Sequence, residues 1–327
     1  MRKGKKIALL VAVLLVVLGA ALGVGAALLG DLTLEGLDAQ ELVTETIPIT
    51  EDFQNISIND SFSDIYFLPS EDDTCKLVFT RLTDVTYTAG VEGDTLAITG
   101  EDGRKWYEMI QFGPGWGELE MVVYLPETQY RDLTITSGAG DLNIPSNFVF
   151  DFALLTTASG DVIFRGGVEK ALTLQTASGD ILAENVRAES LTVNTSSGTI
   201  ALNTVTVGGN LNLDSSSGEM DLTAVECGEL IANSSSGEIE CSDVLAKISI
   251  QMHSDSGELQ LIDCDAASLL LTSSSGDITG TLRTPKVFQA DSDSGNVNVP
   301  HSVSGGLCEI HTSSGNIHFE EFGGIIG

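Results

Sequence analysis

The residues best placed to do chemistry are carboxylates that recur at a regular spacing through the second half of the chain. Each directly follows a glycine, and this residue is acidic in seven of ten copies. The acids are Asp141, Asp161, Asp180, Glu219, Glu238, Glu258 and Asp277, and the other three positions hold Thr199, Asn296 and Asn316. If the copies stack at the spacing of neighbouring strands, about 5 Å, adjacent carboxylates in water repel by about 0.8 kcal/mol per pair.

That repulsion favours either bound cations or hydrogen bonds that hold the acids in place. Asp255 and Asp293 stand two residues before their glycines, near Glu258 and Asp277. Oxygen ligands of this kind suit calcium, so we predict a calcium site formed by Asp255, Glu258, Asp277 and Asp293, and no other cofactor. The simpler alternative is that the acids accept hydrogen bonds from turn amides and keep the surface soluble.

A second candidate metal site uses histidine. His253, Asp291 and His311 each lie four residues before a repeat glycine and so share one outward column. Two imidazoles and a carboxylate form a ligand set for zinc. The simpler interpretation is that these three residues are unrelated surface residues that form no site.

An aromatic cluster stands outside the repeat. Its members are Trp106, Tyr107, Phe112 and Trp116, around the turn at residues 113–115. An exposed aromatic loop stacks on sugar rings or lies at a membrane interface. The interpretation we favour is that the loop plugs one end of the fold.

Catalysis is not expected. Two carboxylates about 6.5–9.5 Å apart would suit an inverting glycosidase, but acids on nearly every copy are periodic, whereas an active site interrupts periodicity. The sequence also has no set of nucleophile, histidine and acid, and no phosphate-binding loop.

The elements that must position these side chains follow from an internal repeat of nineteen or twenty residues. Its glycines are Gly140, Gly160, Gly179, Gly198, Gly218, Gly237, Gly257, Gly276, Gly295 and Gly315. Apolar residues stand five and seven positions before each glycine, and two and four after it, except at Gly280. This period of two on both sides predicts a strand, a corner and a second strand in each copy. Stacking the copies buries the apolar columns, so we predict an all-β parallel β-solenoid of about ten coils over residues 131–321.

The corner has its own pattern. We expect glycine there because it tolerates the dihedral angles of a sharp turn. Serine or threonine stands three positions before every glycine, as in Thr176 and Thr195. On stacked coils these hydroxyl groups are expected to form a ladder that satisfies polar groups at the corner.

The rest of the chain divides by charge and hydropathy. Residues 1–6 are basic and are followed by 23 uncharged residues, 7–29, which span about 35 Å as a helix. We predict a membrane anchor with a cytoplasmic N-terminus and the remainder outside; a cleaved signal peptide, followed by secretion, is the alternative. Residues 30–47 are expected to form a linker, 48–130 a β-rich cap with the first coils, and 322–327 a tail.

Composition narrows the class of partner. The net charge is −32, which excludes nucleic acid because few groups could neutralise phosphates. Five cysteines without a CxxC motif occur in the exterior part, and we expect them to be small buried hydrophobic residues rather than disulfides.

Four segments together resemble a known family. They are Ile58–Ile65, Gly93–Ile98, Val123–Pro126 and the Ser-Gly-acid coils, and in this order they are similar to the bacterial "putative adhesin" family, also described as toastrack-like. The resemblance implies a β-solenoid on the bacterial envelope and offers no catalytic residues. One departure is the first corner, where Phe62 is expected to replace glycine.

These patterns favour a membrane-anchored, non-catalytic binding or scaffold module of the cell envelope. Its expected ligand is a wall polymer, an envelope protein or another copy of itself. The alternatives are a sensor of envelope damage that signals through its membrane helix and, third, a carbohydrate-active enzyme.

Overall fold

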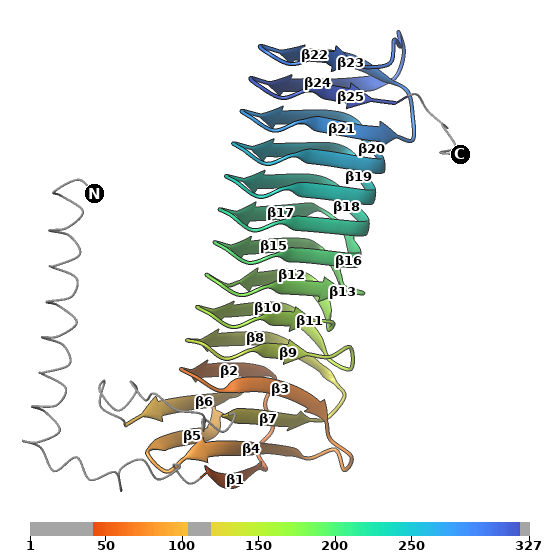
Figure 1. Cartoon of the computed structure of the whole chain (residues 1–327). Coiled ribbons are helices and arrows are strands. Elements are labelled where there is room, and N and C mark those ends of the chain that lie inside the picture. The colour runs from red at the N-terminus through yellow and green to blue at the C-terminus, as the bar shows by residue number, and fades with distance from the viewer. Residues whose placement is uncertain (1–41, 104–118, 321–327) are drawn as a thin grey trace, which may run out of the picture. The chain divides into compact units, whose positions relative to one another are not determined.

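The computed structural model describes residues 42–103 and 119–320, and every regular element in these two ranges is a β-strand (Figure 1). The predicted all-β class is therefore confirmed for the described residues, which fall in one structural unit. None of these residues forms a helix long and apolar enough to cross a membrane. The predicted anchor, 7–29, and the tail, 322–327, lie outside the described ranges.

The chain winds as a parallel β-solenoid, as predicted. Each coil has a front strand before the corner and a rear strand after it, and each pairs in parallel with its counterparts in neighbouring coils. The front strands are β2 (Asn55–Asp60), β8 (Gln129–Ser137), β10 (Val149–Thr157), β12 (Gly167–Gln175), β15 (Ser190–Thr195), β17 (Asn210–Ser215), β22 (Lys286–Ser292) and β24 (Gly306–Thr312). The rear strands are β3 (Asp64–Pro69), β9 (Leu142–Ile144), β11 (Val162–Phe164), β13 (Ile181–Glu184), β16 (Ile200–Val207), β21 (Ile278–Leu282), β23 (Val297–Asn298) and β25 (Ile317–Phe319).

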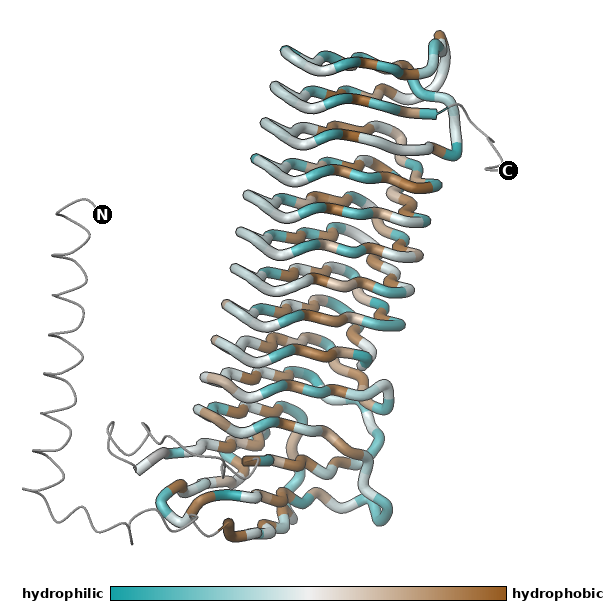
Figure 2. The backbone as a smooth tube through the Cα atoms, viewed as in Figure 1, coloured by the Kyte–Doolittle hydropathy of each residue, from teal (hydrophilic) through white to brown (hydrophobic). Residues whose placement is uncertain are grey.

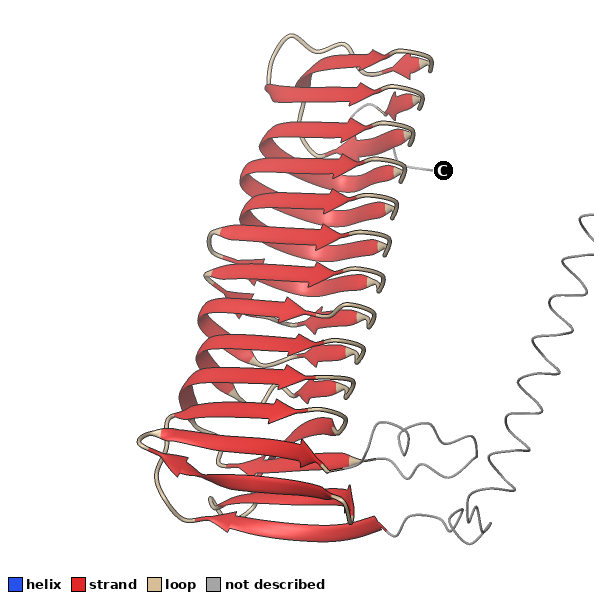
Figure 3. Ribbon diagram, turned by 90° about the vertical axis from the view of Figure 1, so that its left-hand side faces the viewer, coloured by secondary structure: helices blue, strands red, loops and turns tan. Residues whose placement is uncertain are grey.

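Four further strands complete the coils. β18 (Met220–Ser234), β19 (Ile239–Ser254) and β20 (Leu259–Ser273) each form the rear strand of one coil and the front strand of the next without a break. β14 (Arg187–Ala188) is a short strand at the rear turn. Figure 3 shows the same stack from the side.

The core is a narrow apolar column between the front and rear sheets (Figure 2). In one coil it is formed by Leu172 and Leu174 of β12 and by Ile181 and Ala183 of β13, all buried. The same positions are buried in the neighbouring coils, because alternate residues of a strand face one side of its sheet. Burial of each large aliphatic side chain stabilises the fold by about 1.5–3 kcal/mol.

The rear turn needs a left-handed residue in five consecutive coils. The residues six positions after the glycines have φ between 54° and 57°, and they are Asn185, Thr204, Ala224, Asp243 and Asp263. Arg283, on a later coil, forms ion pairs with Asp243 and Asp263. The arginine therefore links turns on three coils.

The N-terminal end of the stack is closed by antiparallel strands. β6 (Thr95–Asp102) and β7 (Glu120–Leu125) pair in parallel with β2 and β3 as one more layer. Below them, β5 (Val85–Glu92) pairs antiparallel with β6, β4 (Cys75–Leu82) with β7, and β1 (Leu42–Ile49) with β4. The change of direction ends the solenoid here and covers its strand edges. The expected linker, 30–47, is too long, because residues 42–47 belong to β1 and pair with β4.

The last coils do not stack in the order of the sequence. β24 and β25, which come last, lie between β20 and β21 on one side and the earlier strands β22 and β23 on the other. In this order Gly280 pairs with Phe319, and a Cβ on Gly280 would lie 2.6 Å from the Leu261 carbonyl oxygen and 2.9 Å from the ring of Phe319. Phe319 thus fills the gap that Gly280 leaves in the apolar column.

The first corner also differs from the prediction. Asp60 pairs with Ser137, so Ser63 aligns with Gly140, and Asp64 with Asp141. The expectation that Phe62 replaces glycine is therefore wrong by one residue. At this corner the Ser63 hydroxyl group forms a hydrogen bond with the Tyr87 hydroxyl group.

Candidate functional site

The most regular polar feature is the corner column, which consists of the repeat glycines, the hydroxyl residue three positions before each, and the residue that follows each. The Thr176 hydroxyl group accepts the Gly179 N–H at 3.1 Å and donates to the Gly160 carbonyl of the preceding coil at 3.1 Å. All ten hydroxyl residues accept the N–H of their own glycine. The predicted hydroxyl ladder is confirmed.

The glycines are required for space. A Cβ on any of the ten would lie 1.7–2.0 Å from a carbonyl oxygen of the neighbouring coil. None of them has a φ in the left-handed region. The expectation that glycine is needed for the dihedral angles of this corner is therefore wrong. Glycine is needed because two backbones approach each other closely there.

The aspartates of the corner column accept hydrogen bonds from backbone amides. Asp141 Oδ1 accepts the Asp161 N–H at 2.8 Å, and Asp161 Oδ1 accepts the Asp180 N–H at 2.7 Å. Asp180 bonds Thr199 N–H in the same way. Among the glutamates, burial, and then the charge of Glu258, raise the pKa of Glu238. The aspartates therefore behave as the simpler alternative predicts, because their side chains accept hydrogen bonds from backbone amides at the turn.

The four residues predicted to bind calcium do not converge. Asp277 accepts the Asn316 N–H at 2.6 Å, and Asp255 Oδ1 lies 3.4 Å from His253 Nε2. Asp293 N–H donates to Thr312, so the coil of Asn316 separates Asp293 from Asp277 by about 10 Å. Glu258 lies on the coil below Asp277.

No group of three or more His, Cys, Asp or Glu side chains in residues 42–103 and 119–320 is arranged to hold a metal ion. Calcium binding stays a prediction. The histidine column is likewise dispersed: His253 bonds Thr272 at 2.9 Å, Thr272 pairs with His311, and His311 Nδ1 lies 3.8 Å from Asp291. A coil with threonine thus separates the two imidazole rings.

The aromatic cluster lies outside the described residues. Trp106, Tyr107, Phe112 and Trp116 belong to residues 104–118, which connect β6 to β7. Neither the binding surface nor the plug is tested, and both stay predictions.

The cysteines are free and buried, as expected for small hydrophobic residues. Burial raises the pKa of the Cys308 thiol to about 12 and that of Cys264 to about 11. Their thiolate forms are therefore scarce at neutral pH, and these thiols are poor nucleophiles.

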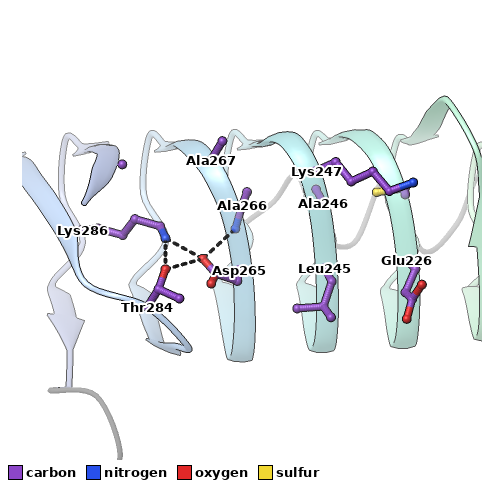
Figure 4. Close-up of a pocket in the computed structure, with 11 residues that line it drawn as sticks. Glu226, Leu245, Ala246, Lys247, Asp265, Ala266, Ala267, Thr284 and Lys286 are labelled. Atoms are coloured by element: carbon purple, nitrogen blue, oxygen red, sulfur yellow. Dashed lines mark hydrogen bonds and ion pairs between the residues drawn. The ribbon is translucent and has the colours of Figure 1, made fainter.

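A cavity of about 640 Å³ opens along the rear turns of the last coils (Figure 4). Small buried residues, among them Cys227, Ala246 and Ala266, line it, and the exposed Lys247 and Glu226 stand at its rim. Opposite charges at the rim suit a polar ligand or a partner loop. The lining includes no paired nucleophile and base.

At one end of this cavity lies a buried ion pair that the sequence did not reveal. Lys286, 2% exposed, bonds Asp265 Oδ1 and Thr284 Oγ1 (Figure 4). Its side chain passes over Gly306, which itself stacks on Ala267. Lys286 therefore ties the outermost coil, β22, across the inserted coil to the coil beneath. No signal in the sequence could have shown this, because the contact depends on the order of the coils.

A second cavity of about 640 Å³ lies in the cap. Its apolar wall includes Ile49, Phe53 and Tyr130, and Asp52 and Lys76 are among its charged residues. Tyr130 stacks on Phe53 with ring centroids 5.9 Å apart and donates to the Pro126 carbonyl at 3.0 Å. Within the described residues the two cavities stand near opposite ends of the stack.

The coils, the glycine-centred corner column and the antiparallel cap define a capped β-solenoid repeat protein. The chain belongs to the Toastrack DUF4097 family, whose model matches residues 53–226 and 189–322.

Several solved structures are similar to this chain, and the first one described here shares its fold. A putative adhesin from Parabacteroides distasonis ATCC 8503 is 13% identical, with a TM-score of 0.51 over 85% of this chain and 97% of that chain. A putative lipid binding protein from the same strain is 20% identical, with a TM-score of 0.49 over 86% of this chain and 97% of that chain. A putative adhesin from Bacteroides fragilis NCTC 9343 is 15% identical, with a TM-score of 0.40 over 86% and 98%. At 13% identity the likeness to the first of these structures concerns the fold alone. A comparison with curated proteins found no match.

Proposed function

We propose that this protein is a non-catalytic binding and scaffold module of the bacterial cell envelope, similar in role to an adhesin. In this proposal residues 7–29 anchor it in the cell membrane, the basic N-terminus stays in the cytoplasm, and the solenoid lies outside. The ligand is a wall polymer or another envelope protein. Membership of the Toastrack family and the shared fold of a protein described as an adhesin support binding.

The observation that carries the proposal is the continuous bonding from coil to coil. Backbone ladders, the hydroxyl ladder and the aspartate bonds repeat along the stack. Ten glycine-centred coils at the spacing of neighbouring strands extend about 43 Å. Such a stack is suited to hold a surface at a fixed distance from its attachment point.

The direction of the stack supports the same function. β1, the first described strand, lies in the cap, and the outermost coil, β22 and β23, is at the opposite end (Figure 1). A segment that precedes β1 therefore attaches at the cap. An anchor in that segment would leave the far end of the stack free to meet a ligand.

A binding experiment tests this function. The full chain is incubated with isolated cell walls and, separately, with envelope membrane proteins, and the bound fraction is measured by cosedimentation. We expect saturable binding to one of these fractions that survives when the membrane segment is exchanged for an unrelated one. If exchange of the membrane segment leaves binding intact but abolishes the function of the protein in the cell, the result would support the sensor of envelope damage instead. Absence of binding to both fractions contradicts the proposal.

A further inference from the structure

The outward side of the front sheet differs in charge from the rest of the stack. Its two central columns are the residues six and four positions before the glycines from Gly140 to Gly276, on strands from β8 to β20 that stack one above another (Figure 1). We call these two columns the front strip. Asp214 is its one carboxylate, and it contains no lysine or arginine. The rear sheet, by contrast, carries the acids of the corner column and also Asp221 and Glu240.

This neutral strip is not what solubility alone would produce. The chain has 47 acidic residues and a net charge of −32. A surface that only keeps a protein soluble is free to carry charge, as the rear sheet does. The front strip instead holds mainly threonine, asparagine and glutamine over consecutive coils, so it suits a partner without charge.

The polar side chains in the middle of the strip have no hydrogen-bond partner within residues 42–103 and 119–320. They are Thr173, Gln175, Thr192, Asn194 and Asn212. All are half-buried, because neighbouring coils place their side chains only about 4.8 Å apart. Crowded side chains lose little rotamer freedom on binding. The strip therefore presents donors and acceptors that are already held in place.

An apolar platform adjoins these groups. Leu154, which is 39% exposed, belongs to the strip and pairs with Thr173, and Phe152, which is 45% exposed, stands two residues before it. Lys170 Nζ lies 4.8 Å from the centroid of the Phe152 ring. Exposed aliphatic and aromatic side chains pack against the C–H faces of sugar rings, and hydroxyl and amide groups bond sugar hydroxyl groups. Both kinds of contact are therefore available side by side.

The spacing of the coils selects among uncharged polymers. Groups on successive coils recur about every 4.8 Å along the stack. An extended peptide rises about 3.3 Å per residue, and the alternate residues that face one side recur at about 6.6 Å, so its groups fall out of step with the coils. A sugar unit of an extended polysaccharide is close to one coil in length and carries hydroxyl groups along its edges. One sugar can therefore lie over each coil.

We propose that the front strip binds an uncharged, extended polysaccharide that runs along the stack, packed on Leu154 and hydrogen-bonded to Thr173 and Thr192. The site rests on the proposed function and names its ligand class as neutral glycan of the wall. Anionic polymers are repelled by the net charge, and the strip has no cation to hold them. A protein partner would need the aromatic and large apolar residues that form the centre of a typical interface, and the strip is mainly polar.

Cosedimentation with chemically stripped walls tests the class of ligand. The full chain in detergent is incubated with isolated walls from which acid treatment has removed the phosphate-containing polymers, and the dissociation constant is measured. We expect binding to persist on these walls and to be the same at low and high salt, because the contact contains no charge pair. Loss of binding on stripping, or strong weakening by salt, identifies a charged polymer and excludes the neutral glycan.

Matched threonine variants locate the contact. Thr192→Val keeps the size and the branched shape of the side chain but removes its hydroxyl group, so the dissociation constant should rise about fivefold, as for the loss of one typical hydrogen bond. Thr223→Val is the control, because Thr223 is exposed on the rear sheet, and it should leave the constant unchanged. Neither hydroxyl group bonds another described residue, so both variants should keep the wild-type unfolding midpoint in urea.

The outcomes separate this site from the proposed function. Saturable wall binding that Thr192→Val does not weaken, or that both variants weaken equally, places the ligand elsewhere and overturns the site while the proposed function stands. Binding to the membrane-protein fraction alone shows that the partner is a protein and excludes the polysaccharide. Absence of binding to both fractions overturns the proposed function and this site together.

Discussion

Replacement of one corner glycine by alanine tests the physical basis of the stack. A Cβ at Gly198 would lie 1.8 Å from the Gly179 carbonyl oxygen and 2.4 Å from its carbon. Both atoms belong to backbone, so no side chain can turn aside. Two ladders of parallel strands hold the coils on either side at their spacing. The Gly198→Ala variant must therefore separate two coils locally by more than 1 Å.

The cost follows from this overlap. Overpacking in a well-packed interior costs about 1–3 kcal/mol, and loss of neighbouring hydrogen bonds adds about 1 kcal/mol each. The smaller entropy of the unfolded chain with alanine offsets about 0.4–1 kcal/mol. We therefore expect Gly198→Ala to lower the free energy of unfolding by about 2–3 kcal/mol.

Urea unfolding followed by circular dichroism measures this change. The control is Gly90→Ala in β5, where no atom lies within 4 Å of the added Cβ. Alanine at this position should be neutral or slightly stabilising. If the unfolding midpoint of Gly198→Ala equals that of the wild type, close backbone approach is not what requires glycine at the corner.

Three further perturbations test individual contacts. Thr176→Val leaves the Gly179 N–H and the Gly160 carbonyl without their hydroxyl partner and should cost about 1–3 kcal/mol, whereas Thr176→Ser should restore most of it in the same urea assay. Lys286→Met removes the buried ammonium that ties down β22, so hydrogen exchange should accelerate in β22 and stay slow in the central strands; uniform acceleration would show that the contact is not local. Because burial and Glu258 raise the pKa of Glu238, the stability linked to its protonation is present below its ordinary value of 4.5 and is lost as the pH rises through the raised value. Glu238→Gln should therefore stabilise the protein at neutral pH but not in acid, and an equal gain at both pH values would contradict this assignment.

Several features could be predicted from the sequence because they depend on local alternation. In a strand the period of two decides which side chains face inward, so the columns that contain Leu174 and Ile181 indicated the core. The interval between glycines predicted the stack, and the hydroxyl at Thr176 predicted the ladder. Because these patterns repeat in every coil, each copy of the repeat gives further evidence for the same prediction.

Tertiary structure decided what depends on contacts between particular coils. The insertion of β24 and β25 beneath β22 places Phe319 against Gly280, and the break of the apolar column at Gly280 does not by itself say which coil packs there. That order separates Asp277 from Asp293, and it brings Lys286 over Gly306 to Asp265. A repeated sequence specifies how any two coils pack, but many orders of stacking share that packing. Only the non-repeated side chains at the end of the solenoid select one order.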